Sequence, residues 1–267
     1  MGRRHHPGGG EAARRRIPRS GADAVDLVNV VRDVDPHATG AVAAPDPFPS
    51  TYQPLAAPPT LIRNAIVLDG AGRRLDGADV LMRDGKIVAV GPGLAADGAT
   101  VVDAQGRWVT PGLIDVHSHL GVYASPGVNA HQDGNEATDP VTAGVWAEHG
   151  VWPQDPGFYT ALAGGVTTLQ VLPGSANLIG GRGVTLRNVA GTTMQEMKFP
   201  GAPHGLKMAC GENPKRVYGD KGRSPSTRMG NVAGYRQAFA DAQDYRRQWE
   251  KYERELAASQ SSQDDGK

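Results

Sequence analysis

The sequence predicts an α/β fold, in which strands and helices alternate along the chain. Residues 60–110 consist of short β-rich runs separated by Gly, Asp and Asn. Two later runs, "GLIDVHSHL" and "GGVTTLQVLP", are continuously apolar and have helical material between them, and residues 231–260 carry apolar side chains at helical spacing. A strand, a crossover and a second strand in that order are the pattern of a βαβ unit.

Residues 1–59 are predicted to form a disordered basic leader and a Pro-rich linker. The leader "MGRRHHPGGGEAARRRIPRS" is rich in Arg and Gly and has one large aliphatic residue after Met1, Ile17. It cannot bury enough apolar surface to fold. A nucleic-acid-binding tail is the alternative for this basic stretch. The following "AVAAPDPFPSTYQPLAAPPT" contains too much Pro for regular elements and is expected to run extended.

Composition excludes several classes of protein. Lys+Arg and Asp+Glu number 28 each, which argues against a general nucleic-acid or anionic-membrane binder. The single cysteine, Cys210, excludes an intrachain disulfide and a multi-thiolate metal site. No run approaches the roughly 20 apolar residues that span a bilayer, and no apolar signal segment follows the basic leader. We therefore expect a cytoplasmic protein without nucleic-acid or membrane partners, or a periplasmic or secreted one if the true start differs.

Residues 60–110 are predicted to form a small antiparallel β unit. The runs "TLIRNAIVLDG", "ADVLMRDGKIVAVGP" and "ATVVDAQGRWVTPG" each have the composition of strands ended by turn residues. In "RDGKI", Asp-Gly stands between two apolar runs, which is a strong hairpin signal.

Residues 111–258 are predicted to alternate strands and helices and to end in a long helix. The two apolar runs are expected to be strands buried on both faces, and "GVTLRNV" and "HGLKMACGEN" are two further strand candidates. The helix is amphipathic, and its apolar stripe consists of Tyr235, Phe239, Ala242, Tyr245 and Trp249. Residues 259–267 are predicted to be a polar tail.

The most informative stretch is "VTPGLIDVHSHLG", in which His117 and His119 flank one serine. Alternate side chains of a strand share a face, so both imidazoles point the same way, about 7 Å apart along the strand. Neutral imidazole is the commonest ligand of zinc and similar ions. The alternative is two polar residues on a solvated strand face. The apolar strand and the flanking glycines favour a metal pair.

This stretch resembles the first-strand signature of the amidohydrolase superfamily, whose HxH motif supplies two metal ligands. The preceding "DGKIVAVGP", and later "ALAGGVTTLQVLPGSANLIGGRGVTLRN" and "GLKMACGENPKRVYG", resemble the imidazolonepropionase-like branch of metal-dependent amidohydrolases. The resemblance covers residues 50–255. It implies a TIM-type (β/α)₈ barrel with a small β-sandwich, and hydrolysis of C–N bonds, often in amides or cyclic amides, by metal-activated water. One or two divalent ions are expected, zinc by default.

The resemblance also implies that a carboxylated lysine or a glutamate completes the metal site. Lys207 lies in the apolar "GLKMA", where burial of an ammonium is costly unless the amine is carboxylated or paired. Glu212 lies in "CGEN", at the expected end of the same strand. We favour Lys207 slightly, and an ordinary ion pair is the alternative for either residue. Asp115 shares the strand face of His117 and is expected to orient a ligand or to cap the strand.

Residues of two loops are candidates for substrate binding. His131 lies in "GVNAHQDGNEATDP", which follows the HxH strand, and Asn177 and Arg182 lie in the Gly-rich "PGSANLIGGRG". Loops that follow barrel strands at their C-terminal ends face the active site in this fold. A solvated loop without a ligand role is the alternative for each. "GGRG" lacks the lysine of a phosphate-binding loop.

The resemblance further implies histidines from the fifth and sixth strands and a general-base aspartate from the eighth. We count about four strands from "GLIDVHSHL" onward, and about 155 residues follow the β unit, whereas a full barrel needs ~250. The expectation is an incomplete barrel that is truncated and inactive alone. The alternative is a non-catalytic half-barrel that binds metal weakly or assembles with a partner chain. A missing C-terminal half, an oligomer partner and a small-molecule amide substrate are the expected partners.

Overall fold

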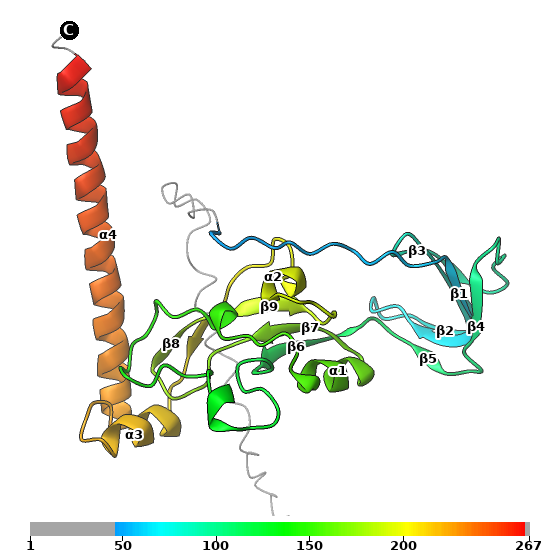
Figure 1. Cartoon of the computed structure of the whole chain (residues 1–267), viewed down its shortest axis with the longest axis horizontal. Coiled ribbons are helices and arrows are strands. Elements are labelled where there is room, and N and C mark those ends of the chain that lie inside the picture. Colours follow the sequence, from blue (N-terminus) through cyan, green and yellow to red (C-terminus); the bar gives the residue numbers. More distant parts are fainter. Residues whose placement is uncertain (1–45, 265–267) are drawn as a thin grey trace, which may run out of the picture. The chain divides into compact units, whose positions relative to one another are not determined.

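The computed structural model describes the backbone of residues 46–264 and the side chains of residues 46–260. The chain divides into two units, residues 1–47 and 48–267. Residues 1–45, on which most of the predicted leader falls, lie outside the described residues, as do residues 265–267. Residues 50–59 contain neither helix nor strand, in keeping with their Pro-rich composition. Figure 1 shows the order of the elements that follow.

The first part of the second unit is one five-stranded sheet with the order β3-β2-β1-β4, in which β5 also pairs with β1. Its strands are β1 (Thr60–Leu68), β2 (Arg74–Arg83), β3 (Lys86–Gly91), β4 (Thr100–Asp103) and β5 (Trp108–Val109). Small apolar residues form its core: Ala65, Val67, Ala78, Val80 and Ala104. Residues 60–110 form a single sheet, without the second layer of a sandwich.

The predicted hairpin is confirmed, and the prediction of a wholly antiparallel unit is wrong. β2 and β3 pair antiparallel, and Asp84 and Gly85 between them have φ of 51° and 69°. Positive φ at both central residues is what a tight hairpin turn requires. However, β4 and β5 pair parallel to β1. Strand direction depends on the connections between strands, which the alternating pattern of one strand does not contain.

The second part contains strands of two further sheets, short helices and one long helix. The strands are β6 (Leu113–Ser118), β7 (Val166–Val171), β8 (Ile179–Arg182), β9 (Val184–Arg187) and β10 (Leu206–Met208). The helices are the 3₁₀ turns η2 (Asn129–His131) and η3 (Ala147–His149), and the α-helices α1 (Pro156–Ala163), α2 (Met194–Met197), α3 (Glu212–Gly219) and α4 (Arg228–Asp264). The sheets have the orders β6-β7-β9 and β10-β8.

The predicted βαβ unit is confirmed. β6 and β7 pair in parallel, and the connection between them contains α1, which lies against β7 (Figure 1). A core of buried apolar residues surrounds β7 and β9: Val122, Ala147, Phe158, Leu169, Val171, Val184, Leu186, Met194 and Met197.

The other two strand candidates are strands, but neither continues a parallel sheet. β9 pairs antiparallel with β7, and β10 pairs antiparallel with β8. The second part is therefore a mixed α/β arrangement in which β6 and β7 pair in parallel, whereas β9 and β10 pair antiparallel with their neighbours.

The prediction that β6 is buried on both faces is wrong for the described residues. Leu113, Ile114 and Val116 are 57%, 67% and 68% exposed. β6 is the edge strand of its sheet, paired with β7 alone. The described residues therefore leave apolar side chains of β6 uncovered.

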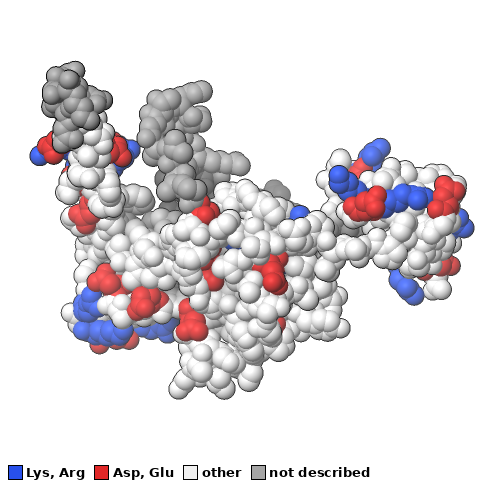
Figure 2. All heavy atoms as spheres, turned by 45° about the horizontal axis from the view of Figure 1, so that its top comes forward, with Lys and Arg blue, Asp and Glu red and all other residues white. Residues whose placement is uncertain are grey.

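The long helix extends further than predicted, to Asp264 rather than to residue 258, so part of the predicted polar tail is helical. Within the part of the chain that the structure describes, no helix combines the length and the apolarity needed to cross a bilayer. On the face shown in Figure 2, Lys and Arg lie interspersed with Asp and Glu, in keeping with the net charge of zero.

Candidate metal centre

His117 and His119 lie at the C-terminal end of β6. His117 belongs to the strand, and His119 follows its last residue, Ser118. The centroids of the two imidazole rings are 5.1 Å apart. The apolar strand therefore ends in two adjacent groups that ligate metals in their neutral form.

The backbone next to β7 orients His119. Its Nδ1 lies 2.8 Å from the carbonyl oxygen of Leu172, the residue that follows β7. A carbonyl accepts hydrogen bonds and cannot donate them, so Nδ1 carries the proton of the neutral ring. The lone pair of Nε2 is then available to a ligand, which is the usual arrangement of a metal-binding histidine.

Lys207 reaches His117 from β10, across 90 positions of the chain. Its side chain is buried, and Nζ lies 3.1 Å from Nε2 of His117. Burial lowers the pKa of Lys207. Burial, and next the charge of Lys207, lower the pKa of His117. Both shifts favour the uncharged groups, the forms that bind metal or react with carbon dioxide.

Asp115 acts on the backbone of β6. Its carboxylate accepts a hydrogen bond of 3.0 Å from the backbone N–H of His117. Of the two roles expected for Asp115, this contact corresponds to fixing the strand rather than to holding an imidazole.

Asp155, which the sequence analysis missed, holds the loop that follows the two histidines. Its side chain is 3% exposed, and its carboxylate accepts hydrogen bonds from three backbone N–H groups. The donors are Gly121 at 2.9 Å, Ser125 at 3.1 Å and Gly157 at 2.9 Å. Asp155 therefore ties residues 121–125 to the start of α1. The signal was present in the sequence, because Asp followed by Pro marks the start of a helix.

Tyr123, also missed, lies beside His119. The two rings meet edge to face with centroids 5.8 Å apart. The hydroxyl of Tyr123 contacts the Asn135 amide, and burial raises its pKa. This places a neutral phenol next to the two histidines.

Glu212, the other predicted metal-completing residue, does not join the histidines. It begins α3, and its carboxylate, on a side chain that is 74% exposed, pairs with Lys215 at 3.2 Å. An exposed pair of this kind contributes little to stability. Glu212 thus forms an ordinary ion pair, which the sequence analysis gave as the alternative to metal binding.

Two of the three predicted substrate-binding residues have structural contacts within their loops. His131 packs on Trp152 with ring centroids 5.0 Å apart, and its Nδ1 lies 2.9 Å from the carbonyl oxygen of Pro126. Asn177 is 1% exposed, and its Nδ2 donates to the carbonyls of Glu136 and Asp139 at 2.7 Å each. Asn177 therefore fixes the loop that follows β7 to the 136–139 loop.

The third, Arg182, belongs to a buried ionic cluster. Its guanidinium donates to Glu148 at 2.9 Å and lies over the ring of Trp146. Glu148 is 3% exposed and also pairs with the buried Lys198 at 2.7 Å. These contacts give Arg182 a structural role, and its contact with substrate stays a prediction.

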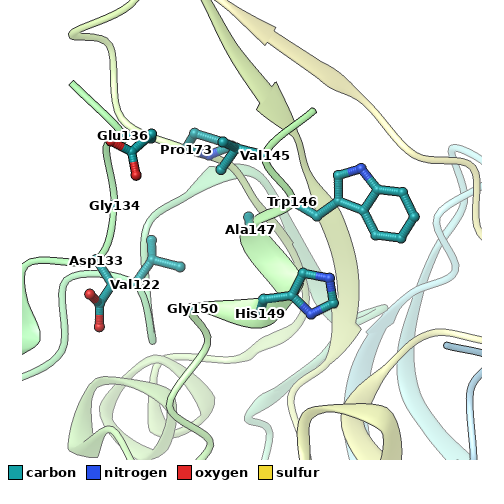
Figure 3. A pocket seen from close by; sticks show the side chains of 10 residues that line it. All are labelled: Val122, Asp133, Gly134, Glu136, Val145, Trp146, Ala147, His149, Gly150 and Pro173. Atoms are coloured by element: carbon teal, nitrogen blue, oxygen red, sulfur yellow. The ribbon is translucent and has the colours of Figure 1, made fainter. Parts of the chain in front are cut away.

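A cavity of about 310 Å³ lies beside the loops that follow β6 and β7 (Figure 3). Asp133 and Glu136 line one side, and His149 lies on the other side, stacked on Trp146 with ring centroids 5.6 Å apart. Among the described residues, no group of three or more His, Cys, Asp or Glu side chains is placed to hold a metal. Of the predicted metal ligands, the structure brings together His117, His119 and Lys207.

Several curated proteins are similar in sequence to this chain. No protein-family model matches the chain. The amidohydrolase tasK of Hapsidospora irregularis is 37% identical over 211 residues, which are 69% of this chain and 22% of that protein. A dihydroorotase of Halalkalibacterium halodurans is 33% identical over 114 residues, 43% of this chain and 21% of the relative. An imidazolonepropionase of Mesorhizobium japonicum is 51% identical over 55 residues, 19% of this chain and 13% of the relative.

A comparison with solved structures gives the same group of proteins. The crystal structure of an amidohydrolase from Thermotoga maritima matches with a TM-score of 0.66 and 43% identity, covering 72% of this chain and 49% of that one. The chain thus spans about a fifth of the length of the curated relatives with the longest matches and about half of the solved structure. From these sequence and structural similarities, the chain belongs to the amidohydrolase superfamily, whose members hydrolyse C–N bonds.

Proposed function

We propose that this chain supplies part of the active site of a metal-dependent hydrolase that acts on C–N bonds of amides or cyclic amides. His117 and His119 are the proposed metal ligands, with carboxylated Lys207 as the group that completes or bridges the site. The contact between Lys207 Nζ and His117 Nε2 carries the proposal. It brings a buried amine to the histidine pair from a distant part of the chain.

The residues present fit a divalent cation, with zinc as the default. The Nδ1 contact of His119 leaves its Nε2 available, and burial lowers the pKa of Lys207. A neutral amine adds carbon dioxide to give a carbamate and releases one proton. Two neutral imidazoles leave the charge of the cation uncompensated. The carbamate is an anionic oxygen donor, so it would balance part of that charge.

When bound, such an ion lowers the pKa of water from 15.7 to about 7 and polarises the scissile carbonyl. The residues of this chain hold the geometry around it. Leu172 fixes the His119 ring through Nδ1, and Asp155 fixes the loop that starts two residues after that histidine. Tyr123 presents a half-buried phenol, with a raised pKa, beside His119. Orientation of ligands by such neighbours tunes metal affinity.

We further propose that β6 and β7 are neighbouring strands of a TIM-type barrel and that the sheet of residues 60–109 is one layer of its accompanying β-sandwich. Sites of such barrels lie at the C-terminal ends of the strands, where both histidines are found. The exposed apolar face of β6 supports this assignment, because a barrel would cover it. The general-base aspartate and the further histidines that the family resemblance implies do not join the two histidines among the described residues, and we propose that this chain is inactive alone.

The substrate class follows from the relatives as a proposal. The names dihydroorotase and imidazolonepropionase denote enzymes that open cyclic amides. We therefore propose a cyclic amide or a related small amide. The alternative function is a non-catalytic half-barrel that binds metal weakly or assembles with a partner chain. It is favoured because the described residues contain no group of three or more His, Cys, Asp or Glu side chains that could hold a metal.

Metal analysis of the purified chain tests the proposed site. After incubation with Zn²⁺ and bicarbonate, the chain is expected to retain metal through dialysis, and His117→Ala, His119→Ala and Lys207→Met are expected to lose it. His131→Ala is the matched control, because His131 packs on Trp152 away from the pair. Equal metal retention in all variants would contradict the site. Hydrolysis of a cyclic amide by this chain without any added chain would rule out the non-catalytic alternative.

A further inference from the structure

The long helix α4 carries an apolar pattern that the proposed active site does not use. Apolar side chains, with a serine at the last position, recur at alternating steps of three and four positions. This spacing is the seven-residue repeat of a coiled coil. We call the six residues of this repeat the α4 seam: Ala242, Tyr245, Trp249, Tyr252, Leu256 and Ser259. Ala242, Trp249 and Leu256 occupy the first position of the repeat, and Tyr245, Tyr252 and Ser259 occupy the fourth.

The α4 seam is exposed along its whole length. Tyr245, Trp249, Tyr252 and Leu256 are 63%, 47%, 53% and 42% exposed. The aromatic rings meet edge to face, with Trp249 centred 6.2 Å from Tyr245 and 5.7 Å from Tyr252. A continuous aromatic stripe on a helix is the kind of surface that another helix covers.

We propose that the α4 seam binds the same seam of a second copy of this chain, in an antiparallel coiled coil. In the alignment that the repeat allows, Trp249 faces Tyr252 of the second copy, Tyr245 faces Leu256, and Ala242 faces Ser259. Each contact occurs twice because of the two-fold axis. Large side chains thus pack at the centre and small ones at the ends.

Charge complementarity supports this alignment. Arg246 and Glu253 occupy the position that flanks the seam on one side, and the alignment sets Arg246 of each copy opposite Glu253 of the other. Flanking charges of this kind set partner choice and orientation in coiled coils. In the described chain Arg246 makes an exposed pair with Glu250 at 3.5 Å, a weak contact that leaves it available for a second carboxylate.

The alignment also keeps clear of Asn231 and Tyr235, through which α4 contacts the rest of its own chain. Asn231 donates to the carbonyl of Gly211 at 3.2 Å, and the Tyr235 hydroxyl contacts the carbonyl of Ala209. Pairing Trp249 with Tyr252 makes residues 237–264 of the two helices overlap, so the partner helix ends before Tyr235. A parallel pair would also set opposite charges together, Asp241 against Arg246, but it would bring both helix bases, with the parts of the chain that they contact, to the same end of the pair.

Matched substitutions test whether the seam binds a second copy. Sedimentation velocity of the purified chain at tens of micromolar is expected to give a dimer. Leu256→Glu is expected to weaken dimerisation at least about tenfold, because a charge enters the buried seam from each copy. Ala257→Glu adds the same charge one position away, on the outer face, and is expected to leave dimerisation unchanged. A monomeric wild type, or equal effects of the two variants, would overturn the proposal.

Charge reversal tests the antiparallel orientation. Arg246→Glu sets like charges opposite each other and is expected to weaken the dimer. The double variant Arg246→Glu/Glu253→Arg restores both pairs in the antiparallel alignment and is expected to recover it. In a parallel alignment the double variant sets the introduced carboxylate at position 246 against Asp241 and does not recover. Failure of the double variant to recover would therefore contradict the proposed orientation.

Disulfide mapping gives a readout that does not depend on affinity. With Cys210→Ser as background, Ala242→Cys/Ser259→Cys is expected to form interchain disulfides between the two positions, identified by mass spectrometry of the linked peptides. Ala242→Cys alone is expected to remain unlinked, because position 242 faces position 259. Efficient linking of 242 to 242 would establish a parallel pair and overturn the antiparallel proposal. None of these residues belongs to the proposed metal site, so this result stands apart from the metal analysis.

Discussion

Lys207 and His117 share a hydrogen-bonding distance although strands of two different sheets carry them. The sequence indicated Lys207 because a lysine in an apolar strand needs a partner or a modification. It did not indicate the contact itself, since β10 reaches β6 through the arrangement of both sheets. The other indicated residue, Glu212, begins a helix and points to Lys215 instead. A short apolar run ending in a carboxylate has the same pattern whether the strand ends before or after that residue.

The depressed pKa values of His117 and Lys207 predict how stability depends on pH in the metal-free chain. Burial, and for His117 also the nearby charges of Lys207 and His119, lowers both from their ordinary values of 6.5 and 10.5. Just below each ordinary value, the unfolded chain binds more protons than the folded chain. The free energy of unfolding therefore rises with pH up to about 6.5 from His117 and up to about 10.5 from Lys207.

Urea denaturation in the presence of a chelator checks the contribution of Lys207 between pH 8 and 9. Lys207→Met is expected to flatten the rise, whereas Lys215→Met, at a more exposed lysine, is expected to leave it unchanged. The tyrosines with raised pKa values act in the opposite direction as the pH approaches their ordinary value of 10, so the comparison stops at pH 9. Equal slopes for the wild type and Lys207→Met between pH 8 and 9 would contradict the lowered pKa of Lys207.

Asp155 is expected to be a large contributor to stability among the carboxylates of the described residues. It is buried and accepts three backbone hydrogen bonds. Hydrogen bonds to a charged group contribute about 1.5–3 kcal/mol each, and loss of the acceptor leaves buried N–H groups unpaired. Asp155→Asn is expected to lower the free energy of unfolding by about 2–4 kcal/mol. Asp76→Asn, in an exposed pair with Arg74, is the control and is expected to change it by less than about 0.5 kcal/mol. Chemical denaturation measures both, and equal values would show that the 121–125 loop does not depend on Asp155.

At the scale of elements, local patterns predicted what depends on neighbouring residues in the chain. Asp-Gly predicted the hairpin of β2 and β3, and apolar runs around helical material predicted β6, α1 and β7. The pairing of β9 and β10 was beyond such patterns, because a short strand has the same composition in a parallel and an antiparallel sheet. The helix end at Asp264 was also missed, since polar residues continue an exposed helix without an apolar period.

Truncation of an apolar side chain is expected to cost much more stability in β7 than in β6. Ile114 in β6 is 67% exposed, whereas Leu169 in β7 is fully buried. Leu169→Ala is expected to cost about 2–5 kcal/mol of stability, and Ile114→Ala less than about 0.5 kcal/mol. Thermal or urea unfolding of the isolated chain measures both. A cost above about 2 kcal/mol for Ile114→Ala would show that another segment or molecule covers β6 in solution.

At the scale of the whole molecule, metal binding is expected to connect the separate sheets. His117 and His119 lie at the end of β6 in one sheet, and Lys207 lies on β10 in another, so an ion held by all three stabilises the arrangement of both sheets. A ligand that binds the folded state alone adds about 2.7 kcal/mol at a free concentration of 100 times its Kd. The chain is therefore expected to show a rise of several degrees in Tm with Zn²⁺, and a larger rise when bicarbonate supports the carbamate. Lys207→Met is expected to lose the bicarbonate-dependent part and His117→Ala the whole shift, measured by differential scanning calorimetry. The same shift in both variants as in the wild type would mean that the ion binds elsewhere and does not connect the two sheets.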